Sequence, residues 1–148
     1  MIDLNGKSPN LLVIGDLMVD HYLWGSCKRI SPEAPVQVVN VDNESILLGG
    51  AGNVINNLKA LGAHVDVISV IGDCNVSYEL KGLVNNIDVE TKYLFTQRGR
   101  ISSKKSRVIS SQQQVIRFDR EETDEISIYS QERILETFTS IIKDYDSV

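Results

Sequence analysis

Residues 10–20 read NLLVIGDLMVD, and this stretch gives the strongest indication of the fold in the 148-residue chain. Its first half is a short apolar run, partly β-branched, which ends at Gly15 and predicts a buried strand over residues 10–15. Asp16 and Asp20 follow, at the end of the strand where open α/β sheets bind their ligands. We therefore expect the two carboxylates to belong to a binding site.

Residues 49–53, GGAGN, stand at the start of a helix predicted over residues 53–61. Glycine lets a ligand approach the backbone closely, and the unpaired N–H groups of a helix start favour oxygen-rich or anionic groups. Gly49, Gly50 and Asn53 are therefore candidate ligand contacts.

A dinucleotide fingerprint is an alternative interpretation of the same glycine run. Its third glycine is replaced by Ile55, and the run lies well inside the chain instead of opening the first strand-helix unit. This incomplete match gives only weak support to a nicotinamide-dependent oxidoreductase.

The residues after the glycine run predict strands over 65–72 and 90–95, with a helix over 78–84 between them. Strands that alternate with helices and short connections form right-handed crossovers and a mostly parallel sheet. The predicted fold is therefore half of a doubly wound α/β domain.

Further β segments are predicted outside this alternation. Residues 36–41 read as a strand with apolar groups on both faces, and residues 107–110 and 115–119 read as a hairpin. A last helix is predicted from about Ser130, the expected N-cap. Its apolar stripe, which we expect in the core, consists of Ile134, Leu135, Phe138, Ile141 and Ile142.

Composition limits the classes of function. A net charge of −5 argues against a broad nucleic-acid surface, because phosphate binding depends on clustered Lys and Arg. Cys27 and Cys74 are expected to be free thiols in a reducing cytoplasm. His21 and His64 have no neighbours at metal-ligand spacing, so no structural metal is predicted. No apolar run is long enough to span a bilayer, which predicts a soluble cytoplasmic protein.

Four segments carry a resemblance to a known family. GDLMVD at residues 15–20 and RISPEAPV at residues 29–36 resemble the heptose 7-phosphate kinases, within the ribokinase-like (PfkB) sugar kinases. KSR at residues 105–107 and QQVIRFD at residues 113–119 support this resemblance. It implies an ATP- and Mg²⁺-dependent carbohydrate kinase that phosphorylates the anomeric hydroxyl of D-glycero-β-D-manno-heptose 7-phosphate, in ADP-heptose and lipopolysaccharide core biosynthesis.

The resemblance also assigns roles to side chains. Asp20 matches the aspartate that holds the sugar hydroxyls, whereas Asp16 is more particular to the heptose kinases; a strand-end aspartate that accepts from backbone N–H groups is an equal alternative for Asp16. Lys105 and Arg107 match basic positions near the sugar phosphate, although solvated side chains on a strand are an equal alternative. Cys74 and Ser77 depart from the family, which more often has Asp and Gly there.

The ribokinase-like fold implied for residues 1–148 is the N-terminal part of one kinase domain, with a small β lid formed by about residues 16–48 and 98–119. The lid also implies a homodimer. No catalytic base, anion hole or nucleotide pocket is recognisable, so these parts and the site for ATP and Mg²⁺ are expected beyond Val148. The chain is thus expected to be a truncated form that is inactive alone. The alternatives are a non-catalytic module for sugar-phosphate binding or dimerisation, and another PfkB kinase such as a fructokinase or ribokinase.

Overall fold

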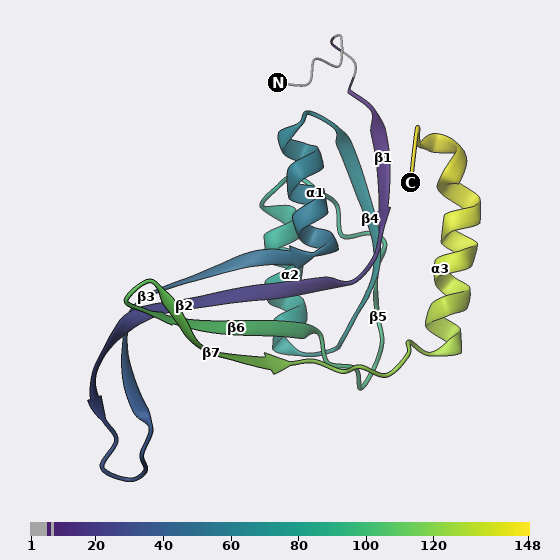
Figure 1. The fold of residues 1–148 in the computed structure, drawn as a ribbon. Coiled ribbons are helices and arrows are strands. Elements are labelled where there is room, and N and C mark those ends of the chain that lie inside the picture. The colour runs from purple at the N-terminus through teal and green to yellow at the C-terminus, as the bar shows by residue number, and fades with distance from the viewer. Residues whose placement is uncertain (1–5, 7) are drawn as a thin grey trace.

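The computed structural model describes residues 6 and 8–148, and its first sheet is parallel (Figure 1). This sheet has three strands in the order β1 (Asn10–Ile14), β4 (His64–Ile71) and β5 (Leu94–Thr96). β4 pairs with both neighbours in parallel. The short apolar runs of β1 and β4 suit such strands because both faces of the sheet are covered.

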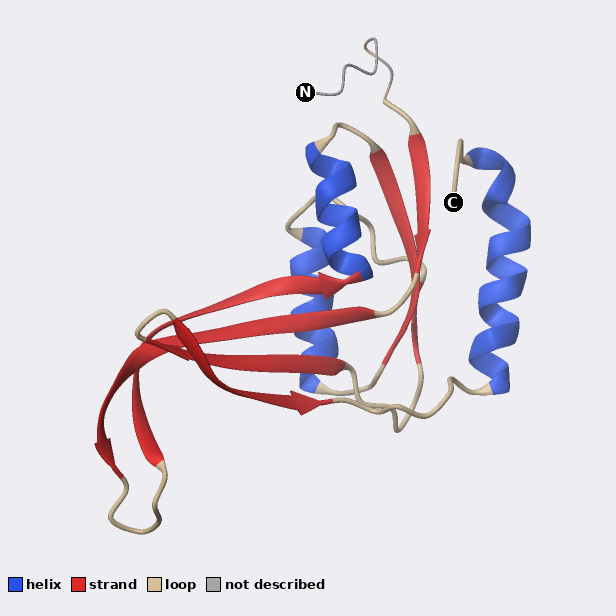
Figure 2. Cartoon of the chain, in the orientation of Figure 1, coloured by secondary structure: helices blue, strands red, loops and turns tan. Residues whose placement is uncertain are grey.

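α-Helices cover both faces of the parallel sheet (Figure 2). α1 (Ala51–Ala60) and α2 (Asn75–Asn85) lie on one side, and α3 (Ile128–Ile141), followed by the 3₁₀ turn Ile142–Asp144, lies on the other. The alternation of strands and helices predicted from the sequence is confirmed. None of the helices in the described part of the chain is long and apolar enough to cross a membrane.

A second sheet of four strands projects from the side of the first (Figure 2). Its order is β3 (Gln37–Gly50), β2 (Leu17–Ile30), β6 (Ser103–Ser110) and β7 (Gln113–Arg120). β2 is antiparallel to β3 and parallel to β6, and β6 is antiparallel to β7. The outer halves of β2 and β3 bend away from the sheet as a long hairpin (Figure 1).

Several predicted strand bounds were wrong. The strand predicted over residues 36–41 begins at Gln37 and is only the start of the 14-residue β3, and the long β2 was not predicted. β5 begins at Leu94 instead of residue 90, because residues 92 and 93 form a turn in which the Leu94 N–H donates to the Thr91 carbonyl (3.1 Å). The predicted hairpin is present as β6 and β7.

The start of α3 also differs from the prediction. Ser127, not Ser130, is the N-cap, and its Oγ accepts a hydrogen bond from the Ser130 N–H (3.2 Å). Leu135 was predicted in the core but is 62% exposed. Other members of the predicted stripe, Ile134, Phe138 and Ile141, pack against the cluster of Leu12, Ile68 and Phe95.

α1 buries a different face from the one that its apolar spacing indicates. The helix begins two residues earlier than predicted, and Gly52 and Ile55 face the core while Val54 is half exposed. A Cβ at Gly52 would lie 2.8 Å from the Leu48 Cβ, so glycine allows this close approach. Gly62, with φ of +92°, follows the helix end as predicted.

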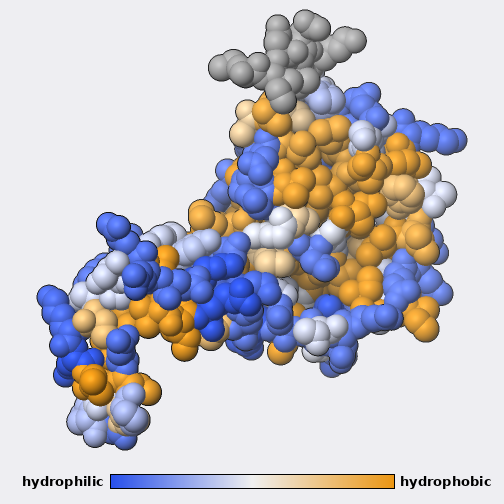
Figure 3. Space-filling model, in the orientation of Figure 1, coloured by the Kyte–Doolittle hydropathy of each residue, from blue (hydrophilic) through white to orange (hydrophobic). Residues whose placement is uncertain are grey.

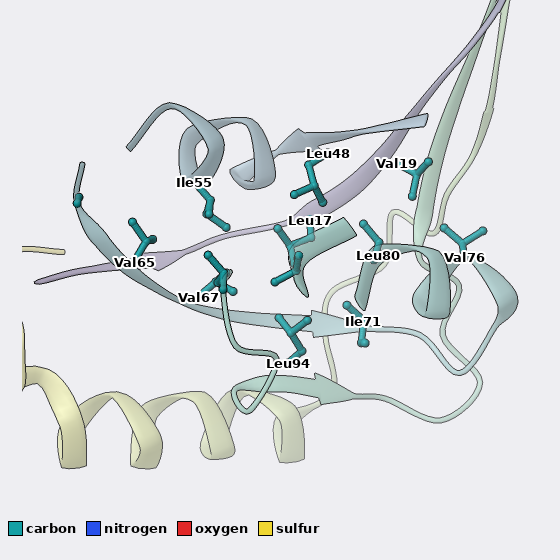
Figure 4. Close-up of a cluster of buried hydrophobic side chains, with 13 residues drawn as sticks. Leu17, Val19, Leu48, Ile55, Val65, Val67, Ile71, Val76, Leu80 and Leu94 are labelled. Carbon is teal, nitrogen blue, oxygen red and sulfur yellow. The ribbon is translucent and has the colours of Figure 1, made fainter. Parts of the chain in front are cut away.

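One hydrophobic core joins the two sheets (Figure 4). Val19 and Leu48 come from the second sheet, Val67 from the first, and Ile55 and Leu80 from α1 and α2. All five are at most 6% exposed, and each buried aliphatic side chain contributes roughly 1.5–3 kcal/mol to folding. The shared core therefore fixes how the second sheet lies relative to the first.

The outer edge of β1 carries an apolar area, visible between α1 and α3 in Figure 3. We call it the β1 apolar surface; it consists of Leu11, Leu12, Val13, Ile14, Val54, Leu58 and Val148. Together with Ser147, these residues line a cavity of about 340 Å³. Among the described residues, this edge is paired in part: the Leu12 N–H donates to the Ser147 carbonyl (3.1 Å), and the Asp146 N–H donates to the Asn10 carbonyl (2.8 Å). Both cysteines are free thiols, as predicted.

Candidate functional site

A cavity of about 630 Å³ lies where the two sheets meet. The end of β4, the start of β2 and the segment between β7 and α3 line it. Asp16 and Met18 contribute from the β1–β2 junction, and Arg100, Ser102 and Ser103 contribute from the approach to β6. The cavity therefore lies at the carboxyl ends of the parallel strands, where α/β folds bind ligands.

Asp20 lies on β2, two residues beyond Met18, and is not among the residues that line this cavity. Its carboxylate lies so close to Gly49 of β3 that a Cβ at position 49 would collide with Asp20 Oδ2. Its other oxygen, Oδ1, accepts a hydrogen bond from Arg107 Nη1 at 2.5 Å. Both side chains are 21% exposed, so water screens the pair only partly. The predicted site residues Asp20, Gly49 and Arg107 are thus brought together.

Lys105 lies directly opposite Asp20 in the parallel register of β2 and β6. Its Nζ is 3.0 Å from Glu121 Oε2 and 3.5 Å from Asp119 Oδ2. The hydrogen bond with Glu121 raises the pKa of Lys105 above its ordinary value. In the same way, the hydrogen bond to Asp20 raises the pKa of Arg107. Both basic side chains lie on β6 and are paired with carboxylates.

The charges on this face of the second sheet balance. Arg117 Nε is 3.1 Å from Asp119 Oδ1, which joins Arg117 to the network. The three cations Lys105, Arg107 and Arg117 therefore meet the three carboxylates Asp20, Asp119 and Glu121. An incoming anion has to compete with these carboxylates for either predicted phosphate-binding side chain.

Gly50 and Asp16 shape the turn between β3 and α1. Gly50 is the N-cap, with φ of +60°, and a Cβ there would collide with the Asp16 carbonyl oxygen. That carbonyl accepts a hydrogen bond from the Ala51 N–H (2.9 Å), while the Asp16 side chain is exposed and lines the cavity. Asn53 is exposed in the first turn of α1 and is not part of the ion-pair network among the described residues.

An acidic segment, residues 121–125, forms one wall of the cavity and was not predicted as part of the site. Arg100 holds it, because Arg100 Nη1 donates to the Asp124 carbonyl (3.0 Å) and lies 3.9 Å from Glu122 Oε1. Glu122 also accepts from the Ile101 N–H (3.2 Å). The run of four acids in five residues was the signal that could have identified this wall.

A small hydrogen-bond network of Gly72, Ser77 and Ser102 supports the loop that carries Arg100. The Ser77 hydroxyl donates to the Gly72 carbonyl (2.6 Å) and lies 2.9 Å from the Ser102 hydroxyl, which accepts from the Gly72 N–H (2.9 Å). Burial raises the pKa of the Cys74 thiol, but hydrogen bonds from the backbone N–H of Ser102 and from Ser77 outweigh it and lower the pKa. Cys74 and Ser77, which differ from the residues usual in the family, thus form hydrogen bonds within this loop region.

The described residues do not fit a site for ATP and Mg²⁺. Among residues 6 and 8–148, no group of three or more His, Cys, Asp or Glu side chains could hold a metal ion. The acidic wall of the cavity would repel a triphosphate. The carboxylates suit the hydroxyl groups of a polyhydroxy ligand, because carboxylates accept hydrogen bonds from hydroxyl groups.

Comparisons with known proteins show which family the sequence matches. The profile of the family described as "pfkB family carbohydrate kinase" matches residues 8–141. "Bifunctional protein HldE" of Aliarcobacter butzleri is 61% identical over 142 residues, which are 96% of this chain and 30% of that protein. The protein of the same name from Sulfurimonas denitrificans is 53% identical over 145 residues, 98% of this chain and 30% of that protein. The chain therefore spans about 30% of the length of these relatives.

Solved structures share the fold at low sequence identity. A carbohydrate kinase from Agrobacterium tumefaciens has a TM-score of 0.59 and 21% identity, over 76% of this chain and 35% of that chain. A nucleoside kinase from Methanocaldococcus jannaschii, a member of the ribokinase family, has a TM-score of 0.54 and 21% identity, over 78% of this chain and 38% of that chain. The ribokinase-like fold predicted from the sequence is confirmed.

Proposed function

The chain belongs to the pfkB family of carbohydrate kinases, and from this membership we propose that it carries the sugar-binding part of a kinase for heptose 7-phosphate. The observation that carries the proposal is the Asp20 carboxylate, one oxygen of which is held by Arg107 while the other lies over Gly49 at the entrance to α1. The segment RISPEAPV at residues 29–36 and the high identity to the relatives support the choice of heptose 7-phosphate.

In the proposed complex, Asp20 accepts hydrogen bonds from two neighbouring sugar hydroxyls. A carboxylate forms short charge-assisted hydrogen bonds with hydroxyls, and glycine at position 49 leaves room for the Asp20 carboxylate itself. Asp16 lines the adjoining cavity and offers a second acceptor. Met18, which lies against both Gly49 and the cavity, provides an apolar contact between the two carboxylates.

The phosphate of the sugar is proposed to bind Arg107 and Lys105. Both side chains are already paired with carboxylates, so the dianion would share Arg107 with Asp20 or displace Glu121 from Lys105. A phosphate dianion matches the planar guanidinium fork of arginine well. Sugar and phosphate recognition are therefore coupled through the Asp20–Arg107 pair.

The test is a calorimetric titration of the chain with D-glycero-D-manno-heptose 7-phosphate, first without and then with MgATP. Binding in the absence of MgATP is the expected result, and fructose 6-phosphate and ribose serve as control ligands. Tighter binding of an unphosphorylated hexose or pentose would instead favour another PfkB kinase. No binding of any of these ligands would contradict the proposal that this chain holds the sugar site.

A second candidate is a sugar-phosphate-binding module without catalysis, because the groups brought together around Asp20 are hydrogen-bonding and charged groups that can bind a ligand. Release of ADP on addition of MgATP distinguishes the two, because only a kinase produces it.

As a further part of the proposal, the chain acts in the cytoplasm and dimerises through the projecting hairpin of β2 and β3. Ile30 and Val41 support that interface, being 67% and 48% exposed on the hairpin.

A further inference from the structure

Two aromatic rings continue the sugar-site face of β2 beyond Asp20. Alternate residues of a strand share a face, so Asp20, Tyr22 and Trp24 project in the same direction. The Tyr22 and Trp24 rings stack, with centroids 5.5 Å apart and an interplanar angle of 18°. Both residues are half-buried, and nothing in the sugar site described so far uses them.

Arg107 connects this aromatic pair to Asp20. Its guanidinium carbon lies 5.2 Å from the centroid of the Tyr22 ring, at a distance typical of a cation–π contact. The same guanidinium donates to Asp20 Oδ1 at 2.5 Å. These contacts therefore form one continuous row along the face, from Trp24 through Tyr22 and Arg107 to Asp20.

The strand register shows why Arg107 needs such support. Arg107 lies directly opposite Tyr22, whereas Lys105 is opposite Asp20, so Arg107 reaches diagonally along the sheet to its carboxylate. On its other side, Arg107 lies directly opposite Arg117 of β7, and like charges in that position repel. Asp119, which pairs with Lys105 and Arg117, is a competing acceptor nearby. A long arginine side chain has several rotamers, and the Tyr22 ring favours the one directed at Asp20.

We propose that Tyr22 is a positioning residue of the sugar site: its ring, backed by Trp24, holds the Arg107 guanidinium against the Asp20 carboxylate. This inference rests on the proposed function, in which Asp20 binds the sugar hydroxyls. Arg107 then occupies one oxygen of Asp20 in a fixed geometry and leaves the oxygen beside Gly49 for the ligand. The ring makes both contacts, so phenylalanine can replace tyrosine while leucine cannot.

The first experiment observes Arg107 itself and needs no ligand. In ¹⁵N-labelled chain, the Arg107 side-chain N–H signals should show a ring-current shift and slow exchange with water. Tyr22→Leu should abolish the shift and speed the exchange, and Tyr22→Phe should retain both. The matched control is Tyr129→Leu, which removes a different aromatic ring, 5.8 Å from the Arg133 guanidinium carbon, and should leave Arg107 unchanged.

The second experiment measures the affinity for heptose 7-phosphate by calorimetry. Tyr22→Leu should weaken binding about fivefold, the effect of losing one cation–π contact, and Tyr22→Phe should restore wild-type affinity. If Tyr22→Leu fails to fold by circular dichroism, Trp24→Leu replaces it, with a partial loss of the Arg107 shift expected.

The outcomes separate this inference from the proposed function. Arg107 signals that are the same in the leucine variant and the wild type would overturn the positioning role, even if the chain binds the sugar. Arg107 signals that change as expected in a chain that binds no sugar phosphate would support the contact but overturn the proposed function. Failure of Tyr22→Phe to restore affinity would also overturn the positioning role.

Discussion

Replacing Asp20 with asparagine should weaken sugar binding strongly, because the carboxylate is the central acceptor of the proposed site. Asparagine keeps the shape and one oxygen but removes the negative charge. A hydrogen bond to a charged group contributes roughly 1.5–3 kcal/mol, which corresponds to about a tenfold to 150-fold loss of affinity. The Asp20 side chain is only 21% exposed, so water cannot replace the lost interaction fully. Calorimetric titration at low ionic strength measures the change.

The Asp20–Arg107 pair adds a second expectation for Asp20→Asn. The substitution leaves Arg107 without its carboxylate partner, and the released guanidinium can then bind a phosphate more strongly. The loss of affinity should therefore be smaller for heptose 7-phosphate than for heptose without the phosphate. Titrating the variant with both sugars measures this difference directly.

Asp66→Asn is the matched control for Asp20→Asn. Asp66 is 22% exposed, pairs with Lys92 (3.3 Å) and accepts a hydrogen bond from the Tyr145 hydroxyl, but it lies near the amino end of β4, away from the site. It should change stability without changing sugar affinity. Wild-type affinity in Asp20→Asn, or an equal loss in Asp66→Asn, would refute the assignment of Asp20.

Three further predictions concern stability and association. Ser127→Ala removes the N-cap oxygen that binds the Ser130 N–H and should lower the free energy of unfolding by about 1 kcal/mol in urea. Burial and the hydrogen bond to Asp66 raise the pKa of the Tyr145 hydroxyl, so the folded protein keeps a proton that the unfolded chain releases near pH 10. Wild-type stability should therefore fall as the pH rises above about 10, more steeply than that of Tyr145→Phe in urea unfolding. The β1 apolar surface should make the chain self-associate in sedimentation, and Val54→Lys should reduce this, since Val54 is 49% exposed; a wild-type monomer at every concentration would argue otherwise.

Local signals in the sequence were sufficient for most of the elements. The apolar run of β1, the glycines before α1 and the hairpin of β6 and β7 were predicted because hydrophobic period and turn residues act over a few neighbours. The predictions failed where packing decides. The spacing of Val54, Leu58 and Leu61 indicated a buried helix face, but Gly52 let α1 approach Leu48 and turned Ile55 inward instead.

The same division applies to the candidate site. The sequence by itself indicated Asp16, Asp20 and the glycine pair, because these residues follow a strand end and open a helix. Only the tertiary structure showed that Arg107 donates a hydrogen bond to Asp20, because these two residues are 87 positions apart in the chain. Their contact depends on the parallel register of β2 and β6, which the core between the sheets and the helices sets over long range. No local pattern encodes that register, because it is the product of burying both sheets against one core.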